Sequence, residues 1–166
     1  MTAAIGWPER ATAGDRKTIL DRTRTVAIVG ASADPARPSY FVGTYLCSSS
    51  TDYDIWFVNP KGGEILGRRV YTSLDDLPGV PDMVDVFRKP ADCPGVATDA
   101  VRIGARCLWL QLGVVSDEAA EIAHRAGLDV VMDRCIKIEH ARFAGGLHLA
   151  GFDTGVISAR RAEPRH

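Results

Sequence analysis

The stretch VAIVGASADPARPSYFVGTYL, residues 26–46, decides the fold of this chain. Its apolar run ends at Gly30, a polar turn with two prolines follows, and apolar residues then recur at helical spacing. A strand, a turn and a helix in this order present free backbone amides at the helix start, where an anion such as phosphate can bind. The dinucleotide pattern G-x-G-x-x-G would require glycines at 32 and 35, but Ser32 and Pro35 stand there. The stretch therefore predicts an anion-binding turn unlike that of an ordinary NAD enzyme, with a plain turn that binds nothing as the alternative.

The bulk composition predicts one globular domain and excludes several functional classes. The 166 residues are 46% hydrophobic and 25% charged, with a formal net charge of -1, so a core can form and no basic field favours nucleic acid. The apolar runs are too short to span a bilayer. Residues 1–17 contain no apolar core followed by a small-residue cleavage site, so we expect a cytoplasmic protein. The four cysteines match no common zinc spacing, so we expect no metal site.

Apolar strand-like runs alternate with helical patterns along most of the chain. Short, continuous apolar runs that are followed by helices are typical of a parallel sheet covered on both faces. Right-handed crossovers then favour a doubly wound α/β fold, so we predict a three-layer α/β/α Rossmann-like domain with a mostly parallel five-stranded sheet. The strands are expected at 25–30, 54–59, 83–88, 107–113 and 129–133, with a short extended piece near 69–71, and the helices at 38–49, 91–105, 116–127 and 137–143. The predicted domain covers 25–155, between a helical extension over 1–24 and a basic tail over 156–166.

The end of the second predicted strand carries an informative lysine. NAD sites usually place an acid there to bond the ribose hydroxyls, but this strand runs into Asn59-Pro60-Lys61. A cation at that place suits a phosphate on the ribose, which NADP carries at the 2′ position and coenzyme A (CoA) at the 3′ position. Because ligands of such sheets bind at the carboxyl ends of the strands, we expect Lys61 and the turn at Gly30 to form one site. Taken alone, Lys61 would be interpreted as a solvated loop lysine, and it is the order of the strands, which couples it to the turn at Gly30, that favours a phosphate partner.

Four segments of the chain resemble the stand-alone CoA-binding domain proteins of bacteria and archaea. These proteins are Rossmann-fold domains similar to the CoA-binding domain of the succinyl-CoA synthetase alpha subunit. The segments occur in the same order and spacing as in that family, and the resemblance covers residues 20–155. They are VGASADPARPSYFVGTYL (29–46), VNPKGGEILGRRVYTSLDDLP (58–78), VDVFRKP (84–90) and VVMDRCIKIEH (130–140).

The resemblance implies a CoA site built from the ends of four strands. The first turn would hold the CoA diphosphate, and the second strand end would meet the adenosine, with Lys61 as the partner of the ribose phosphate. The ends of the third and fourth strands would line the adenine and pantetheine side. The implied residues are Gly30, Ala31, Ser32, Arg37, Pro38, Ser39, Val58, Asn59, Pro60, Lys61, Phe87, Arg88, Lys89, Leu110, Gln111, Leu112 and Gly113.

The sequence shows no catalytic constellation. It has neither a G-x-S-x-G elbow nor a Walker A pattern, and we expect all four histidines to be non-catalytic. The synthetase carries its phosphorylated histidine in a second domain that has no counterpart here, so the resemblance does not imply ligase activity. Cys135, at a strand end beside Arg134, could form a mixed disulfide with the CoA thiol. We favour the alternative that Cys135 is a half-buried structural thiol.

The function that the sequence favours is binding of coenzyme A or an acyl-CoA without self-contained catalysis, in a regulatory or carrier role. The alternative is a small NADP-dependent reductase, which explains Lys61 equally well but not the missing glycines. A structural or protein-interaction role comes third, because it would leave the turn at Gly30 and Lys61 without a ligand. The sequence specifies neither the acyl group nor a protein partner, and it leaves open whether the chain forms a homo-oligomer.

Overall fold

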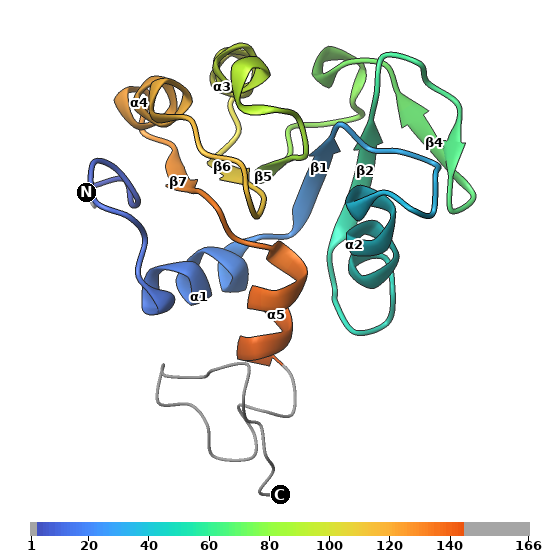
Figure 1. The fold of residues 1–166 in the computed structure, drawn as a ribbon, viewed down its shortest axis with the longest axis horizontal. Coiled ribbons are helices and arrows are strands. Elements are labelled where there is room, and N and C mark those ends of the chain that lie inside the picture. Colours follow the sequence, from blue (N-terminus) through green and yellow to red (C-terminus); the bar gives the residue numbers. More distant parts are fainter. Residues whose placement is uncertain (1–2, 145–166) are drawn as a thin grey trace, which may run out of the picture.

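The structure, a computed structural model, describes residues 3–144. A sheet of seven strands in the order β3-β4-β2-β1-β5-β6-β7 runs through its middle (Figure 1). All neighbouring strands are parallel except the pair β3 and β4. This confirms the predicted α/β, Rossmann-like fold. The strands are β1 (Thr25–Val29), β2 (Asp54–Val58), β3 (Glu64–Ile65), β4 (Arg68–Tyr71), β5 (Met83–Val86), β6 (Cys107–Leu110) and β7 (Asp129–Val131).

The prediction of five strands was wrong, because β3 and β4 extend the sheet beyond β2. The extended piece expected near 69–71 is β4, and it pairs with β2 in parallel through Val70 and Tyr71. The two-residue strand β3 folds back on β4 in antiparallel orientation. The turn between them places both Leu66 and Gly67 at positive φ, which is the backbone conformation of a tight hairpin.

Five helices cover the sheet, and local sequence signals explain where several of them begin. Thr12 and Asp15 form a reciprocal capping box at the start of the first helix. Pro38 occupies the first turn of the second helix. At the fourth helix, the hydroxyl of Ser116 accepts a hydrogen bond from the amide of Ala119. No helix among residues 3–144 is long and apolar enough to cross a membrane. The helices are α1 (Ala13–Arg22), α2 (Pro38–Leu46), α3 (Cys93–Ile103), α4 (Asp117–Arg125) and α5 (Ile136–Ala144), with short 3-10 turns at Leu74–Asp76 and Pro90–Asp92. The tail predicted over 156–166 lies outside the described residues.

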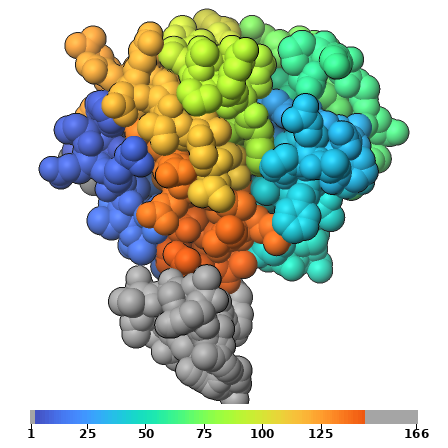
Figure 2. Space-filling view, in the orientation of Figure 1, coloured from blue at the N-terminus to red at the C-terminus, as the bar shows by residue number. Residues whose placement is uncertain are grey.

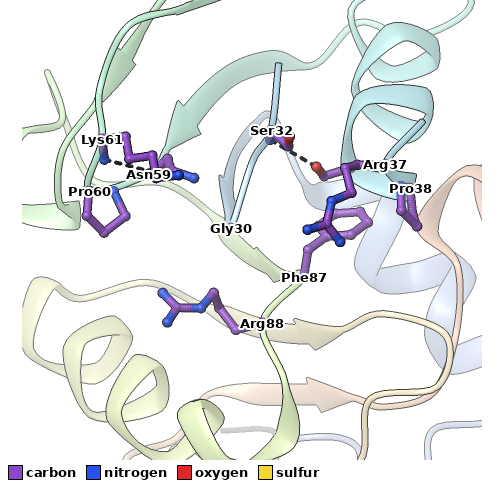
Figure 3. A pocket seen from close by; sticks show the side chains of 10 residues that line it. Gly30, Ser32, Arg37, Pro38, Asn59, Pro60, Lys61, Phe87 and Arg88 are labelled. Atoms are coloured by element: carbon purple, nitrogen blue, oxygen red, sulfur yellow. Dashed lines mark hydrogen bonds between the residues drawn. The ribbon is translucent and has the colours of Figure 1, made fainter. Parts of the chain in front are cut away.

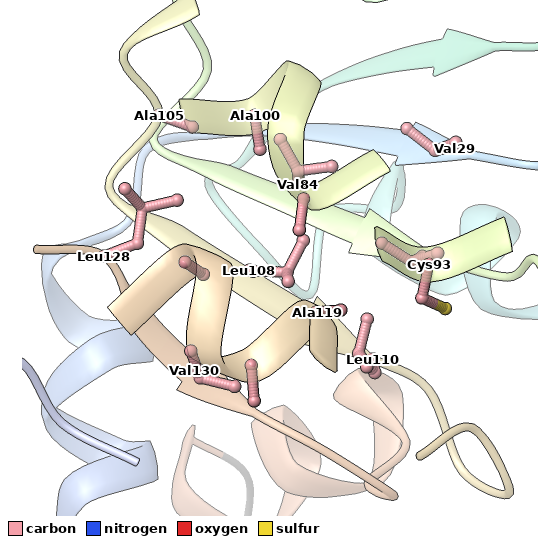
Figure 4. Close-up of a cluster of buried hydrophobic side chains, with 14 of the residues drawn as sticks. Val29, Val84, Cys93, Ala100, Ala105, Leu108, Leu110, Ala119, Leu128 and Val130 are labelled. Atoms are coloured by element: carbon pink, nitrogen blue, oxygen red, sulfur yellow. The ribbon is translucent and has the colours of Figure 1, made fainter. Parts of the chain in front are cut away.

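The helices form two layers, one on each face of the sheet. Helices α3 and α4 pack on one face through small side chains, against strand residues such as Val84 and Leu108 (Figure 4). Helices α1, α2 and α5 cover the other face, where the largest buried side chains, including Trp109 and Phe57, lie. On that face α5 and α2 meet (Figure 2), and the Lys137 ammonium lies 4.4 Å from the ring centroid of Phe41. The molecule therefore has the three predicted layers.

Two features of the packing bring the strand ends and α2 together. Val29 of β1 pairs with Val58 of β2 and with Val86 of β5, so these three strands end at the same level. Helix α2 lies close to the sheet at Gly43, where a Cβ atom would stand 2.9 Å from the ring of Phe57. The first turn of α2 lies beside the carboxyl end of β1, because the hydroxyl of Ser39 in that turn accepts a hydrogen bond from the amide of Ser32 at 3.0 Å.

Candidate functional site

A cleft of about 550 Å³ opens at the carboxyl ends of β1, β2 and β5. Figure 3 shows Asn59, Pro60 and Lys61 on one side of it, Arg37 and Pro38 on the other, and Gly30 between them. This is the edge at which open parallel sheets bind their ligands. The cleft is lined by Gly30, Ser32, Arg37, Pro38, Ser39, Asn59, Pro60, Lys61, Phe87 and Arg88, all of which were predicted from the sequence.

The absence of a side chain at Gly30 makes room for a neighbour. Gly30 has a φ of +86°, a conformation that other residues rarely adopt. A Cβ atom here would lie 3.0 Å from Cδ of Arg88 and 3.2 Å from the carbonyl carbon of Phe87. The stem of Arg88 therefore lies against the turn, so closely that a side chain at position 30 would push it aside.

Most amides of the first turn donate hydrogen bonds within the chain. The amides of Gly30 and Ala31 both donate to the carbonyl oxygen of Val58, at 3.1 and 3.2 Å. The amide of Ser32 donates to the buried Oγ of Ser39 at 3.0 Å. The turn thus offers fewer amides to a phosphate than its sequence predicts, and the positive side chains around the cleft become more important for holding an anion.

Asn59 joins the two sides of the cleft. Its Nδ2 donates to the carbonyl oxygen of Ala31 at 2.7 Å, and its Oδ1 accepts from the amide of Lys61 at 2.8 Å. The backbone N–H of Asn59 donates to the carbonyl oxygen of Tyr71 at 2.9 Å. The first turn and the loop that carries Lys61 are therefore fixed to each other. An Asn that bonds the backbone two residues later is a known turn device, so the sequence contained a signal for this role that we did not use.

Three cations from three strand ends face the cleft (Figure 3). Arg37 and Lys61 are exposed, and within residues 3–144 neither has a carboxylate oxygen within 4.0 Å. Arg88 is paired, because its Nη2 lies 2.9 Å from Oδ2 of Asp92. Sequence reasoning missed Asp92, although its i,i+4 spacing from Arg88 was visible. Cations that converge in this way make the cleft suited to a ligand with several negative charges.

Seven of the predicted site residues do not line the cleft. Ala31 and Val58 are buried behind its wall, and Lys89 is exposed beyond it. The end of β6 does not reach the cleft either, and its side chains have other positions: Gln111 Oε1 accepts a hydrogen bond from the amide of Ile136, while Leu112 is exposed. The residues predicted at the end of the fourth strand therefore lie outside the cleft, although Leu110 of β6 ends level with Val86 of β5. The seven are Ala31, Val58, Lys89, Leu110, Gln111, Leu112 and Gly113.

The remaining candidates for chemistry lie apart from the cleft lining. Cys93 is buried behind Arg88, and burial raises the pKa of its thiol to about 11. Cys135 is half-buried against the core of the α1, α2 and α5 face. Glu139 is bound to Arg16, whereas His140 Nδ1 lies 2.9 Å from the hydroxyl of Tyr45, so these adjacent residues serve different contacts. In the part of the chain described here, no group of three or more His, Cys, Asp or Glu side chains could hold a metal ion.

Comparisons with known proteins agree with this fold. The family model described as "CoA binding domain" matches residues 24–141. The uncharacterized protein YneT of Bacillus subtilis (strain 168) is 38% identical over 125 residues, which are 75% of this chain and 91% of YneT. A solved structure of a hypothetical protein from Pyrococcus horikoshii OT3 is 36% identical, with a TM-score of 0.77, and the match covers 87% of this chain and 99% of that one.

A larger protein contains the same fold as a part of its structure. The dinucleotide-forming acetyl-coenzyme A synthetase 1 of Ca. Korarchaeum cryptofilum matches with a TM-score of 0.60 at 21% identity. The match covers 70% of this chain but 27% of the synthetase, so it shows a shared fold alone. The family match, in contrast, extends over all the strands and the whole cleft, from before β1 into α5. The chain therefore belongs to the CoA-binding domain family.

Proposed function

We propose that the protein binds coenzyme A or an acyl-CoA in the cleft at the carboxyl ends of β1, β2 and β5. The observation that carries the proposal is the convergence of Arg37, Lys61 and Arg88 on one cleft. CoA has three phosphate groups, two in the diphosphate and one on the ribose. A family match to CoA-binding domains and a cleft with three cations support the same ligand.

Within this proposal the three cations have different partners. Lys61 binds the phosphate on the ribose, because it stands at the second strand end, where the ribose of a nucleotide lies in this type of sheet. Arg37 and Arg88 bind the diphosphate from the two sides of the turn at Gly30. Phe87 offers an aromatic surface to the adenine. The pantetheine arm leaves the cleft along the sheet edge toward Gln111 and Leu112.

The proposed role is binding without self-contained catalysis, as a sensor or carrier of CoA. Its support is the chemistry of the lining, because the ten described residues that form the cleft include no carboxylate, histidine or cysteine. General acid–base and nucleophilic catalysis usually depend on such groups. A step that uses the thiol of CoA would therefore require a group from outside this lining.

An NADP-dependent reductase is the second candidate, and one observation favours it. Lys61 suits a phosphate at the 2′ position of a ribose as well as one at the 3′ position. The two candidates differ in the ligand that stabilises the folded protein, so one experiment separates them.

The experiment is thermal unfolding of the purified protein with CoA, acetyl-CoA, NADPH or NADH. At a hundredfold excess over its Kd, a ligand that binds only the folded state adds about 2.7 kcal/mol of stability, which raises the unfolding midpoint by about 5–10 °C in a chain of this size. We expect CoA and acetyl-CoA to give this shift and Lys61→Ala to reduce it. Lys17→Ala is the matched control, because Lys17 lies on α1, which leads into the opposite end of β1. A shift with NADPH and none with CoA would replace the proposal by the reductase.

A further inference from the structure

The ion pair between Arg88 and Asp92 distinguishes Arg88 from the other two cations of the cleft. Its Nη2–Oδ2 distance is 2.9 Å, and the two side chains are 38% and 32% exposed. Within residues 3–144, Arg37 and Lys61 have no carboxylate within the same 4.0 Å limit. One of the three positive charges is therefore already neutralised by the protein itself.

The carboxylate of Asp92 does not cap α3. Asp92 is the last residue of the 3-10 turn Pro90–Asp92 and directly precedes α3, and its backbone is helical, with φ -89° and ψ -13°. A capping Asp has an extended backbone instead, and its side chain accepts a hydrogen bond from an amide of the first helical turn. Here the carboxylate makes no such bond and binds Arg88 instead. The position of Asp92 is therefore not explained by capping of α3.

Arg88 is held so that its charged end can reach either Asp92 or the cleft. Its backbone follows directly after Phe87, whose amide donates to the carbonyl oxygen of Val29 at 2.9 Å. Its stem lies against the turn at Gly30, where Cδ stands 3.0 Å from the position that a Cβ atom would take. Arg88 also lines the cleft, so rotation about its last side-chain bonds moves the guanidinium between Asp92 and the cleft.

We propose that Asp92 is a built-in competitor of the ligand phosphate for Arg88. In the empty cleft Asp92 holds Arg88, and a bound diphosphate takes over the guanidinium and releases Asp92. The inference rests on the proposed function, because it concerns the same cleft and a ligand with a diphosphate. It adds that part of the binding free energy of CoA is used to break this ion pair, so that Asp92 lowers the affinity.

The test is a double-mutant cycle on Arg88 and Asp92, measured by calorimetric titration of CoA at fixed ionic strength. Partly exposed pairs are weak, so Asp92→Asn should tighten CoA binding by about 1.5- to fivefold. Arg88→Gln should weaken binding by about tenfold or more, because a hydrogen bond to a charged group is lost. In the Arg88→Gln background, Asp92→Asn should have no further effect. Asp99→Asn, in the helix α3 that follows Asp92, is the control for charge, and it should leave the affinity unchanged.

A second readout separates competition from a general change of the fold or the field. Without ligand, Asp92→Asn should lower the unfolding midpoint slightly, since it removes an ion pair, while the affinity for CoA rises. Asp92→Ser, which also removes the carboxylate, should tighten binding as well. Unchanged or weaker binding of CoA by both variants would overturn the inference, and so would an equal gain in the Arg88→Gln background or in Asp99→Asn.

The same cycle with inorganic pyrophosphate separates this inference from the proposed function. If the wild type binds no CoA, the proposed function is wrong. The competition then stands or fails on pyrophosphate, which should bind more tightly to Asp92→Asn only when Arg88 is present. If neither probe binds, both proposals are overturned.

Discussion

The two faces of the sheet are packed in different ways, although helices cover both. The face under α3 and α4 is filled by apolar side chains, and its helices approach the strands through alanines. Small residues of this kind allow a helix to lie close to a sheet but leave no room for larger side chains. The alanines are Ala97, Ala100, Ala119, Ala120 and Ala123.

The face under α1, α2 and α5 combines larger side chains with buried ionisable groups. Alternation along β5 and β7 places Asp85 on the same face as Met83, and Asp129 on the same face as Val131. Arg16 of α1 and Glu139 of α5 form a buried ion pair above these strands. A larger side chain should therefore destabilise the face under α3 and α4, and the loss or gain of a charge should destabilise the face under α1, α2 and α5.

The largest effect is expected from breaking the buried pair of Arg16 and Glu139. The Nε–Oε1 distance is 2.6 Å and both side chains are nearly inaccessible, so Glu139→Leu leaves a buried charge without its partner. The free energy of unfolding should fall by about 3–5 kcal/mol, measured by urea denaturation. The double variant Arg16→Met/Glu139→Leu should recover most of the loss, because an apolar pair can replace a buried ion pair.

A surface pair on the same helix provides the control for this prediction. On α1, Nζ of Lys17 lies 2.7 Å from Oδ2 of Asp21, but the two side chains are 41% and 62% exposed. Asp21→Ala should change the free energy of unfolding by about 0.5 kcal/mol or less. Equal losses for Asp21→Ala and Glu139→Leu would show that burial does not determine what the pair contributes.

A smaller effect is expected from enlarging a side chain on the apolar face. Ala120 of α4 is fully buried, so Ala120→Leu should force α4 away from the sheet and lower the free energy of unfolding by about 1–3 kcal/mol. Ala126→Leu adds the same atoms at an exposed position directly after α4 and should be nearly neutral. If Ala120→Leu unfolds in the same urea range as the wild type, the alanine face is not tightly packed.

Asp85 should give the second face a pH dependence that the first one lacks. Its carboxyl is fully buried, neither oxygen has a hydrogen-bond partner among the described residues, and burial raises its pKa well above 3.8. The nearby thiol of Cys107 has its pKa raised by burial too, so it remains uncharged at neutral pH. Asp85 is therefore protonated in the folded state over a pH range in which it is ionised in the unfolded state.

The sign of the resulting effect follows from the protons bound in each state. The folded state binds one proton more, so the contribution of Asp85 to stability is complete below pH 3.8 and falls as the pH rises toward its raised folded pKa. The fall is at most about 1.4 kcal/mol per pH unit. We would measure the free energy of unfolding by denaturant titration at several values between about pH 5 and pH 8. The value for Asp85→Asn should rise relative to that of the wild type as the pH rises. A constant difference would mean that Asp85 is ionised in the folded protein.

Much of the fold was predictable because buried parallel strands are read as continuous apolar runs. The hairpin of β3 and β4 was not, for a local reason. Its two-residue turn uses Leu66 at a φ of 52°, where Asn, Asp or Gly is the usual signal. A strand of two residues also has too few positions to show an alternating pattern.

Parts of the candidate site could be predicted from the residues that follow a single strand, as for Gly30 after β1 and Lys61 after β2. The sequence could not determine which strand ends converge, because this depends on the order of strands in the sheet. The end of β6 is separated from β1 by β5, and Leu112 accordingly lies outside the cleft. Asp92 was missed because only the structure shows that its carboxylate is turned to Arg88 and not to the start of α3.

The smallest change in stability, and the most local one, is expected at Asn59. This residue belongs to neither helix-covered face but to the cleft, where it bonds Ala31 and the amide of Lys61. Asn59→Ala removes both bonds and should lower the free energy of unfolding by about 1 kcal/mol, while binding of CoA weakens because Lys61 is no longer held.

A second variant at this position, Asn59→Asp, separates the two bonds. It keeps the acceptor for the amide of Lys61 and loses the donor to Ala31. If the position of Lys61 is what Asn59 provides, the loss of CoA affinity relative to the wild type at the same salt concentration, measured by titration, should shrink in Asn59→Asp as salt screens the new charge, and should stay constant in Asn59→Ala. Losses that are equal in the two variants at every salt concentration would mean that the bond to Ala31, which joins the two sides of the cleft, is the contact that matters.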